Sequence, residues 1–262
     1  MLQRVLTSVV GLAVFFVIVF SNSIVLNGAV ILLVFGMLYE MYKAIDVPKA
    51  IWAVGFISTV VLMVALFLHA VLPAVLFTIT LFLLLSVFFH GKLAYEKVYA
   101  TGFVTLYLVL FMSTVIQTRM EFGIGALMLI FLCAWMTDTG AYFSGYFFGK
   151  HKLIPKVSPK KTVEGAIGGV IWCVAACALY QFIIVKCGIG ISGLEGYLRI
   201  MLLGAGASVL SQLGDLIASA LKRDCAVKDF GTIFPGHGGI LDRFDSVVFI
   251  APFIFYFLKL VI

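Results

Sequence analysis

Long apolar runs follow one another along almost the whole of this 262-residue sequence, and they restrict the possible fold more than any other feature. Hydrophobic residues make up 63% of the chain and charged residues 11%, whereas soluble domains average about 45–50% and about 25%. A soluble protein of this composition would lack the polar groups needed to cover its surface. We therefore predict an all-α, polytopic integral membrane protein in which lipid surrounds most of the chain.

The runs predict about nine transmembrane helices, since each needs roughly 20 apolar residues. We place them at residues 5–20, 24–38, 51–67, 74–89, 100–117, 123–148, 166–185, 197–221 and 241–260. With a cytoplasmic N-terminus, 14 of the 18 basic residues fall in cytoplasmic loops, as the positive-inside rule requires. The net charge of +6 is therefore attributed to membrane orientation and to anionic lipids or phosphates, and not to nucleic acid.

Polar chemistry is concentrated in the second half, because eight of the 12 acidic residues lie at or after Asp138. We divide the chain into an N-terminal transmembrane region, residues 1–122, with five spans, and a C-terminal catalytic transmembrane region, residues 123–262. The catalytic region holds four spans and two long cytoplasmic loops. The five cysteines, three of them inside apolar runs, are interpreted as small packing residues.

Two carboxylates lie inside predicted spans. Asp215 shares a helical face with Ser219 and Lys222. Asp138 is followed on its own face by Gly145, which allows another helix or a ligand to approach closely. A carboxylate at membrane depth is costly unless it is paired, bound to a metal or solvated by a cavity. Both positions predict a functional cavity. The alternative for Asp215 is a structural Asp–Lys pair, and the alternative for Asp138 is a hydrogen-bonded packing motif.

The basic loop before the seventh span contains Ser158 followed by proline, which predicts a helix N-cap. Lys160 and Lys161 would then lie in the first helical turn, where cations oppose the helix dipole unless an anion binds there. Phosphate is the natural candidate for that anion. Attraction of an ordinary basic loop to anionic lipid is the alternative.

The densest polar segment lies between the last two spans. It contains Lys222-Arg223, Lys228-Asp229, Pro235-Gly236-His237-Gly238-Gly239 and Asp242-Arg243-Phe244-Asp245. Glycines let backbone amides approach a phosphate closely, and the histidine among them is placed to donate to an anion. The aspartates three residues apart share a helical face, and carboxylates beside several cations suit Mg²⁺ carrying a polyphosphate.

The segment from Ser219 to Asp245 resembles the signature of the phosphatidate cytidylyltransferases, also called CDP-diacylglycerol synthases, without departure from the pattern. Residues 158–165 are also similar to a stretch seen in this family. The resemblance implies that CTP and phosphatidate give CDP-diacylglycerol and pyrophosphate, with Mg²⁺ required. It further implies a homodimer, metal binding at Asp215 and Asp242, and potassium as a candidate additional ion.

These observations lead to a set of predicted roles. The predicted catalytic residues are Asp215, Asp242, Lys222 and His237, and the metal ligands are Asp215 and Asp242, with Asp138 as a further candidate. The predicted substrate-binding residues are Ser158, Lys160, Lys161, Thr162, Glu164, Ser219, Arg223, Lys228, Asp229, Gly238, Gly239, Arg243 and Asp245. We expect this site at the cytoplasmic face of the cytoplasmic membrane, where a lipid phosphate meets soluble CTP.

Two other functions are compatible with the same residues. A CTP-dependent polyprenol kinase would share the metal and triphosphate sites but transfer the γ-phosphate to an alcohol. An ion-coupled transporter would use the intramembrane carboxylates as ion sites, although no inverted repeat is visible. The reaction products distinguish the two enzymes, and nucleotide-independent solute uptake would favour the transporter.

Overall fold

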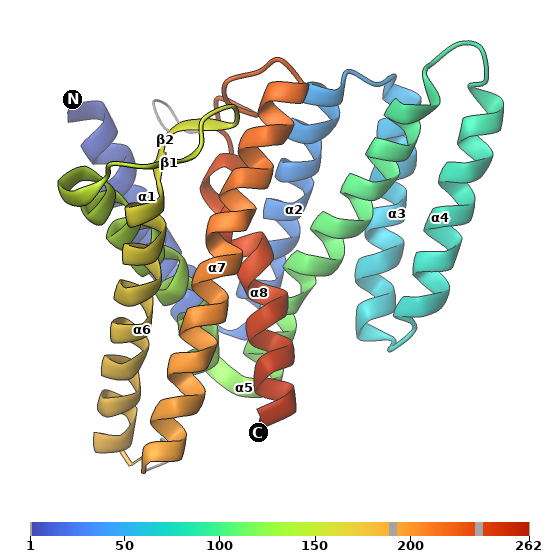
Figure 1. Ribbon diagram of the computed structural model, residues 1–262. Helices are drawn as coiled ribbons and strands as arrows, with labels where there is room; N and C mark the ends of the chain where they lie inside the picture. Colours follow the sequence, from blue (N-terminus) through green and yellow to red (C-terminus); the bar gives the residue numbers. More distant parts are fainter. Residues whose placement is uncertain (1, 189–192, 234–237, 262) are drawn as a thin grey trace. The chain divides into compact units, whose positions relative to one another are not determined.

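Helices account for most of the computed structural model, which describes residues 2–188, 193–233 and 238–261 (Figure 1). In chain order the elements are α1 (Leu2–Phe20), α2 (Ser23–Ile45), α3 (Lys49–Phe67), α4 (Val71–Phe88), α5 (Tyr95–Phe148), β1 (Lys152–Ile154), β2 (Ser158–Thr162), α6 (Val163–Lys186), α7 (Leu194–Asp224) and α8 (Leu241–Val261). Seven of the described helices, α2 to α8, are long and apolar enough to cross a membrane. The predicted all-α polytopic class is confirmed.

Helix α5 is too long for a single span, because its 54 residues would extend for about 80 Å if straight. Two predicted spans, 100–117 and 123–148, both fall on it. Gly123 separates them with φ 80° and ψ −169°, a backbone conformation that is essentially restricted to glycine. The total of nine spans, with α1 as the first, stays a prediction, as does the cytoplasmic N-terminus.

The segment after α5 forms an antiparallel β-hairpin, in which Ser158 lies opposite Ile154. The predicted helix N-cap at Ser158 is therefore wrong. Thr162 caps α6 instead: its backbone is extended, and its side-chain oxygen accepts a hydrogen bond from the Gly165 N–H at 3.1 Å. The two lysines of β2 thus precede the helix and avoid its first turn, where their charge would oppose the helix dipole.

The chain folds as two compact units, and neither is continuous in sequence. The first unit is Met1–Ile116 with Asp224–Arg243, and the second is Gln117–Arg223 with Phe244–Ile262. One boundary thus falls close to the division at residue 122 that we drew from the polar chemistry. The segment 224–243 nevertheless groups with the N-terminal spans, so compact units and predicted functional regions differ there.

In the first unit, α2 packs on α3, and α3 packs on α4 beside it (Figure 1). Tyr42 of α2 is fully buried and bonds to the Thr105 hydroxyl at 2.7 Å. Because that hydroxyl donates to the Thr101 carbonyl, the tyrosine is the donor. Gly55 of α3 lies directly against the tyrosine ring, where a side chain has no room. These contacts pack the last turns of α2 against α3 and α5.

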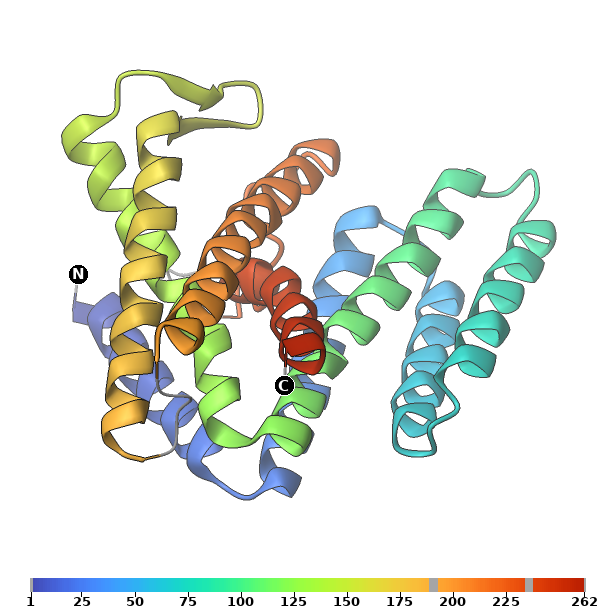
Figure 2. The ribbon, with the colours of Figure 1, turned by 60° about the horizontal axis from the view of Figure 1, so that its bottom comes forward.

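In the second unit, small residues bring α5, α6 and α7 close together. A side chain at Gly165, in the first turn of α6, would come within 2.9 Å of the Ala141 carbonyl oxygen and within 3.2 Å of Gly145 on α5. Further along α6, the buried Cys173 donates to the Gly204 carbonyl of α7 at 3.2 Å. The β-hairpin lies beyond the first turn of α6 (Figure 2). The close approach of α5 and α6 places that hairpin above both helices.

Replacing Gly123 by alanine should destabilise the protein by about 1–3 kcal/mol, because the kink in α5 needs a backbone conformation that a Cβ atom disfavours. The matched control is Gly28→Ala in α2, where a Cβ has nothing within 4 Å. That change should be neutral or stabilising by up to about 1 kcal/mol, since alanine favours a helix more than glycine. Denaturant unfolding in detergent measures both variants; equal stability would show that the kink does not require glycine.

Candidate active site

A cavity of about 560 Å³ lies in the second unit, bounded by α5, the β-hairpin, α6 and α7. Its polar lining consists of Asp138, Tyr142, Tyr146, Lys160, Lys161, Thr162, Gln212 and Asp215. Five of these are predicted site residues, contributed by α5, β2 and α7. The structure therefore brings together the two predicted intramembrane carboxylates and the predicted basic segment.

Lys161 of β2 and Asp215 of α7 form an ion pair in the cavity wall. Their side chains keep 27% and 34% of their surface exposed, respectively. A pair this open contributes at most about 1 kcal/mol to stability. It compensates a carboxylate among apolar helices and still leaves both groups accessible from the cavity. The helical stripe had pointed to Lys222 as the neighbouring cation, but the observed partner comes from a different element.

Asp138 of α5 lines the same cavity, followed by Tyr142 and Tyr146 at intervals of four residues. This spacing puts the three side chains on one helical face. The two tyrosine rings stack, with centroids 6.4 Å apart and planes 16° apart. The cavity thus combines two carboxylates, two lysines and phenol groups. Such a wall offers oxygen ligands to a cation and positive charge to an anion.

Three polar cavity residues were missed by the sequence analysis. Gln212 donates from Nε2 to the Ala166 carbonyl at 3.1 Å and so ties α7 to the start of α6. Its position three residues before Asp215 was a usable signal, because such residues share a helical face. Tyr142 and Tyr146 gave no comparable signal, since aromatic residues are common in apolar spans.

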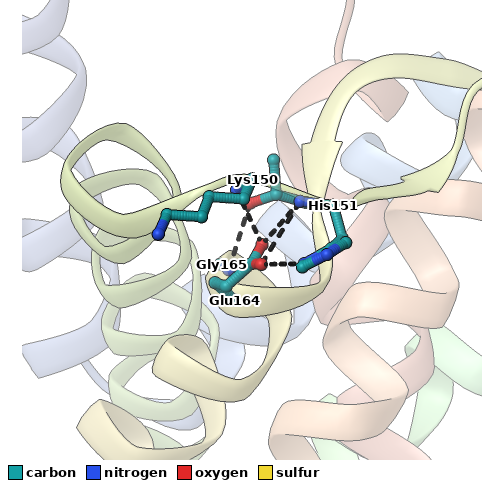
Figure 3. A network of polar contacts seen from close by, with 5 residues as sticks. Lys150, His151, Glu164 and Gly165 are labelled. Carbon is teal, nitrogen blue, oxygen red and sulfur yellow. Dashed lines mark hydrogen bonds and ion pairs between the residues drawn. The ribbon is translucent and has the colours of Figure 1, made fainter.

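The hairpin is anchored by Glu164, in the first turn of α6 (Figure 3). Its carboxylate accepts hydrogen bonds from the backbone N–H groups of Lys150 and His151 at 3.1 and 3.2 Å. It also lies 2.6 Å from the His151 ring Nδ1. We predicted Glu164 to bind substrate; the contacts observed here hold the hairpin that carries Lys161. Ser158, at the other end of β2, is not among the residues that line the cavity.

The remaining predicted residues of the second unit lie near helix ends. Ser219, Lys222 and Arg223 occupy the last turns of α7, after Asp215, and are not part of the cavity lining. Asp245 lies in the first turns of α8, where its Oδ1 accepts the N–H of the next residue at 2.8 Å. Their predicted contacts with substrate stay predictions.

The other predicted residues belong to the first unit, namely Lys228, Asp229, Gly238, Gly239, Asp242 and Arg243. Asp242 organises this segment, because its Oδ2 accepts the N–H groups of Phe230 and Gly239, each at 2.9 Å. Gly238 beside it has φ 84°, a value that favours glycine. Lys228, Asp229 and Arg243 are exposed. The predicted His237 lies outside the described residues.

Residues 2–261 match the model of the cytidylyltransferase family. The chain belongs to this family. A phosphatidate cytidylyltransferase of Bacillus subtilis is 40% identical over 71% of this chain and 67% of its own length. Phosphatidate cytidylyltransferases of Staphylococcus saprophyticus and Staphylococcus aureus are 34% and 35% identical, each over 95% of both chains. The resemblance inferred from residues 219–245 is confirmed.

The match to the cytidylyltransferase family extends through both compact units. It therefore includes the cavity with Asp215 as well as the segment with Asp242. It also includes α1 to α4, where the sequence analysis found little polar chemistry. Family membership thus extends to the polar residues of the N-terminal spans.

Replacing Glu164 by alanine should loosen the hairpin, because two backbone N–H groups lose a charged acceptor. Hydrogen bonds of this kind are worth about 1.5–3 kcal/mol, so amide exchange across residues 150–162 should accelerate by roughly tenfold or more. Hydrogen–deuterium exchange with mass spectrometry gives the measurement. Lys156→Ala, at an exposed position in the hairpin turn, is the matched control. Unchanged exchange in the Glu164 variant would contradict the anchoring role.

Proposed function

We propose that this chain transfers the cytidylyl group of CTP to phosphatidate, giving CDP-diacylglycerol and pyrophosphate. Membership of the cytidylyltransferase family and the names of its relatives support this reaction. The observation that carries the proposal is the cavity in which Lys160 and Lys161 meet Asp138 and Asp215 among apolar helices. This is a composition suited to phosphate groups and their counter-ions at the edge of a membrane.

The membrane helices have a direct use in this reaction. Phosphatidate keeps its acyl chains in lipid while its phosphate must meet CTP from the aqueous phase. The cavity lies at the hairpin end of α6, and five lysines fall within residues 150–161. By the positive-inside rule this end faces the cytoplasm. We therefore propose a protein of the cytoplasmic membrane whose active site opens to the cytoplasm, and we retain the expected homodimer as part of the proposal.

The cavity fits a magnesium ion by the chemistry of its donors. Asp138 and Asp215 present carboxylate oxygens, which Mg²⁺ prefers, and the volume leaves room for water and phosphate oxygens as further ligands. Asp242 remains a proposed ligand, with its carboxylate held by two backbone N–H groups. When bound, the ion would neutralise triphosphate charge and make the α-phosphorus more electrophilic. Potassium is the candidate second ion.

The proposed chemistry needs no covalent enzyme intermediate. A phosphate oxygen of phosphatidate forms a bond to the α-phosphorus of CTP, and the bond from that phosphorus to the bridging oxygen of the β-phosphate breaks. Pyrophosphate leaves with the electron pair. Catalysis then depends on positioning the two anions and on neutralising their repulsion. Lys161, oriented by Asp215, and the neighbouring Lys160 perform this within the cavity.

Further cations are proposed to bind the same substrates. We assign neutralisation of triphosphate and lipid phosphate to Lys222, Arg223, Lys228 and Arg243. The backbone amides of Gly238 and Gly239, with His237, are proposed to bind the pyrophosphate portion, because glycines permit close approach of the backbone to phosphate oxygens. The remaining predicted substrate contacts are those of Ser158, Thr162, Ser219, Asp229 and Asp245.

The test is incubation of the purified protein in mixed micelles with labelled CTP, phosphatidate and Mg²⁺. We expect CDP-diacylglycerol and pyrophosphate in equal amounts, loss of the reaction with EDTA, and its return with added Mg²⁺. In a parallel incubation with a polyprenol in place of phosphatidate, formation of CDP and a phosphorylated polyprenol would instead identify the kinase. In proteoliposomes, solute uptake without nucleotide, and without formation of a CDP-lipid in the micelle assay, would identify the transporter.

Asp215→Asn should lower turnover by about 10²–10³-fold, because it removes the charge that orients Lys161 and a proposed metal ligand. The matched control is Glu195→Gln on the same helix, which makes the same chemical change at an exposed position paired with Arg199. That variant should keep wild-type activity. Near-normal turnover of Asp215→Asn at saturating Mg²⁺ would refute the assignment.

A further inference from the structure

A buried carboxylate lies near the end of α2, outside the polar half of the chain. Glu40 is only 1% exposed. Its Oε1 accepts the Ile240 N–H at 2.8 Å, and its Oε2 accepts the Leu241 N–H at 3.0 Å. Leu241 is the first residue of α8, so Glu40 supplies acceptors for N–H groups that have no partner within their own helix.

Two glycines of the same segment are packed against this carboxylate. A Cβ atom at Gly231 or at Gly239 would collide with the Glu40 side chain. Neither glycine needs a left-handed backbone, since neither Gly231 nor Gly239 has a positive φ. Their small size is therefore explained by the approach of Glu40. One side chain from α2 contacts residues on both sides of the segment 232–238.

Asp242 also joins Phe230 to the residues at the start of α8. Its Oδ2 accepts the N–H groups of Phe230 and Gly239, while Glu40 accepts those of Ile240 and Leu241. Each carboxylate thus accepts two N–H groups. Together the two carboxylates hold residues 239–241 and Phe230 in place. All of these contacts lie within the first compact unit. Moving Glu40 would shift the start of α8 and with it the carboxylate of Asp242.

A cap for α8 alone would not need a residue from α2. Serine, threonine or aspartate just before a helix can accept its first N–H groups locally, as Thr162 does for α6. At α8 the acceptor comes from a helix 200 residues earlier in the chain. The arrangement therefore caps the N-terminus of α8 and also fixes it to α2.

We infer that Glu40 is a positioning residue that holds the start of α8, and through it Asp242, in the geometry needed for cytidylyl transfer. The inference rests on the proposed function, and it adds a residue from the N-terminal spans to a site otherwise drawn from the second half of the chain. Glu40 acts through backbone N–H groups and does not itself contact substrate.

The test compares Glu40→Gln with Tyr42→Phe. Glutamine keeps the size of the side chain but replaces one acceptor oxygen by an NH₂ group, which faces an N–H donor. Phenylalanine removes a buried hydrogen bond two residues away on α2 without touching the segment. Both variants perturb α2, so a general loss of packing would affect them alike, and thermal unfolding in detergent measures that loss.

Two readouts separate positioning from stability. Amide exchange of residues 238–244 should accelerate in Glu40→Gln and stay at the wild-type rate in Tyr42→Phe. In the CDP-diacylglycerol assay, Glu40→Gln should need more Mg²⁺ for half-maximal rate or lose turnover, by about 10- to 100-fold, while Tyr42→Phe keeps both. Equal Mg²⁺ dependence and equal turnover in the two variants would overturn the inference.

A second pair of variants keeps Glu40 in place and covers the case in which Glu40→Gln does not fold. Gly231→Ala should lower activity and accelerate amide exchange of residues 238–244, because its Cβ meets the Glu40 carboxylate, while Gly28→Ala on α2 should leave both unchanged. Wild-type exchange and activity in Gly231→Ala would overturn the inference. The exchange measurement needs no substrate; if the wild-type protein forms no CDP-diacylglycerol, the proposed function fails, while exchange still shows whether Glu40 holds α8.

Discussion

A carboxylate among apolar helices must be compensated, and this constraint accounts for the main polar contacts of the protein. Asp215 is compensated by Lys161, and Glu40 by the N–H groups at the start of α8. In each case the partner lies on another element, far away in the sequence. These contacts also stabilise the fold. The Lys161–Asp215 pair joins the hairpin to α7 in one unit, and Glu40 joins the start of α8 to α2 in the other.

The predicted functional residues outside the helices lie on the β-hairpin and on the segment before α8, and a glutamate anchors each of these two elements. Glu164 holds the hairpin at the start of α6, and Glu40 holds the segment before α8. Negative charge is favourable at both places, because a helix N-terminus carries partial positive charge. The hairpin presents Lys160 and Lys161, and the segment presents Asp242. Both proposed binding elements thus depend on a buried or half-buried glutamate that lies outside the cavity.

The sequence predicts the helices well, because chains in lipid must satisfy backbone groups within each segment and helices are one of few solutions. Asp138 and Asp215 could be found for a related reason: an acidic residue inside an apolar run is a strong signal. The Thr162 cap was missed because Ser158-Pro159 matches the usual N-cap pattern equally well, and only the hairpin decides between them. The role of Glu40 could not be predicted, because the residue lies at the end of an apolar run, where a charge is ordinary. Its partners are backbone N–H groups, which almost every residue type supplies.

The openness of the Lys161–Asp215 pair is suited to the proposed reaction. A deeply buried pair would be costly to separate, because each charge would lose its partner in a medium of low dielectric. A pair that keeps about a third of its surface exposed is worth at most about 1 kcal/mol and separates readily. In the proposed reaction, a triphosphate entering the cavity would draw the lysine to phosphate and the aspartate to the accompanying cation at little cost. The pair would then hold both charges in place between turnovers without competing with the substrates for them.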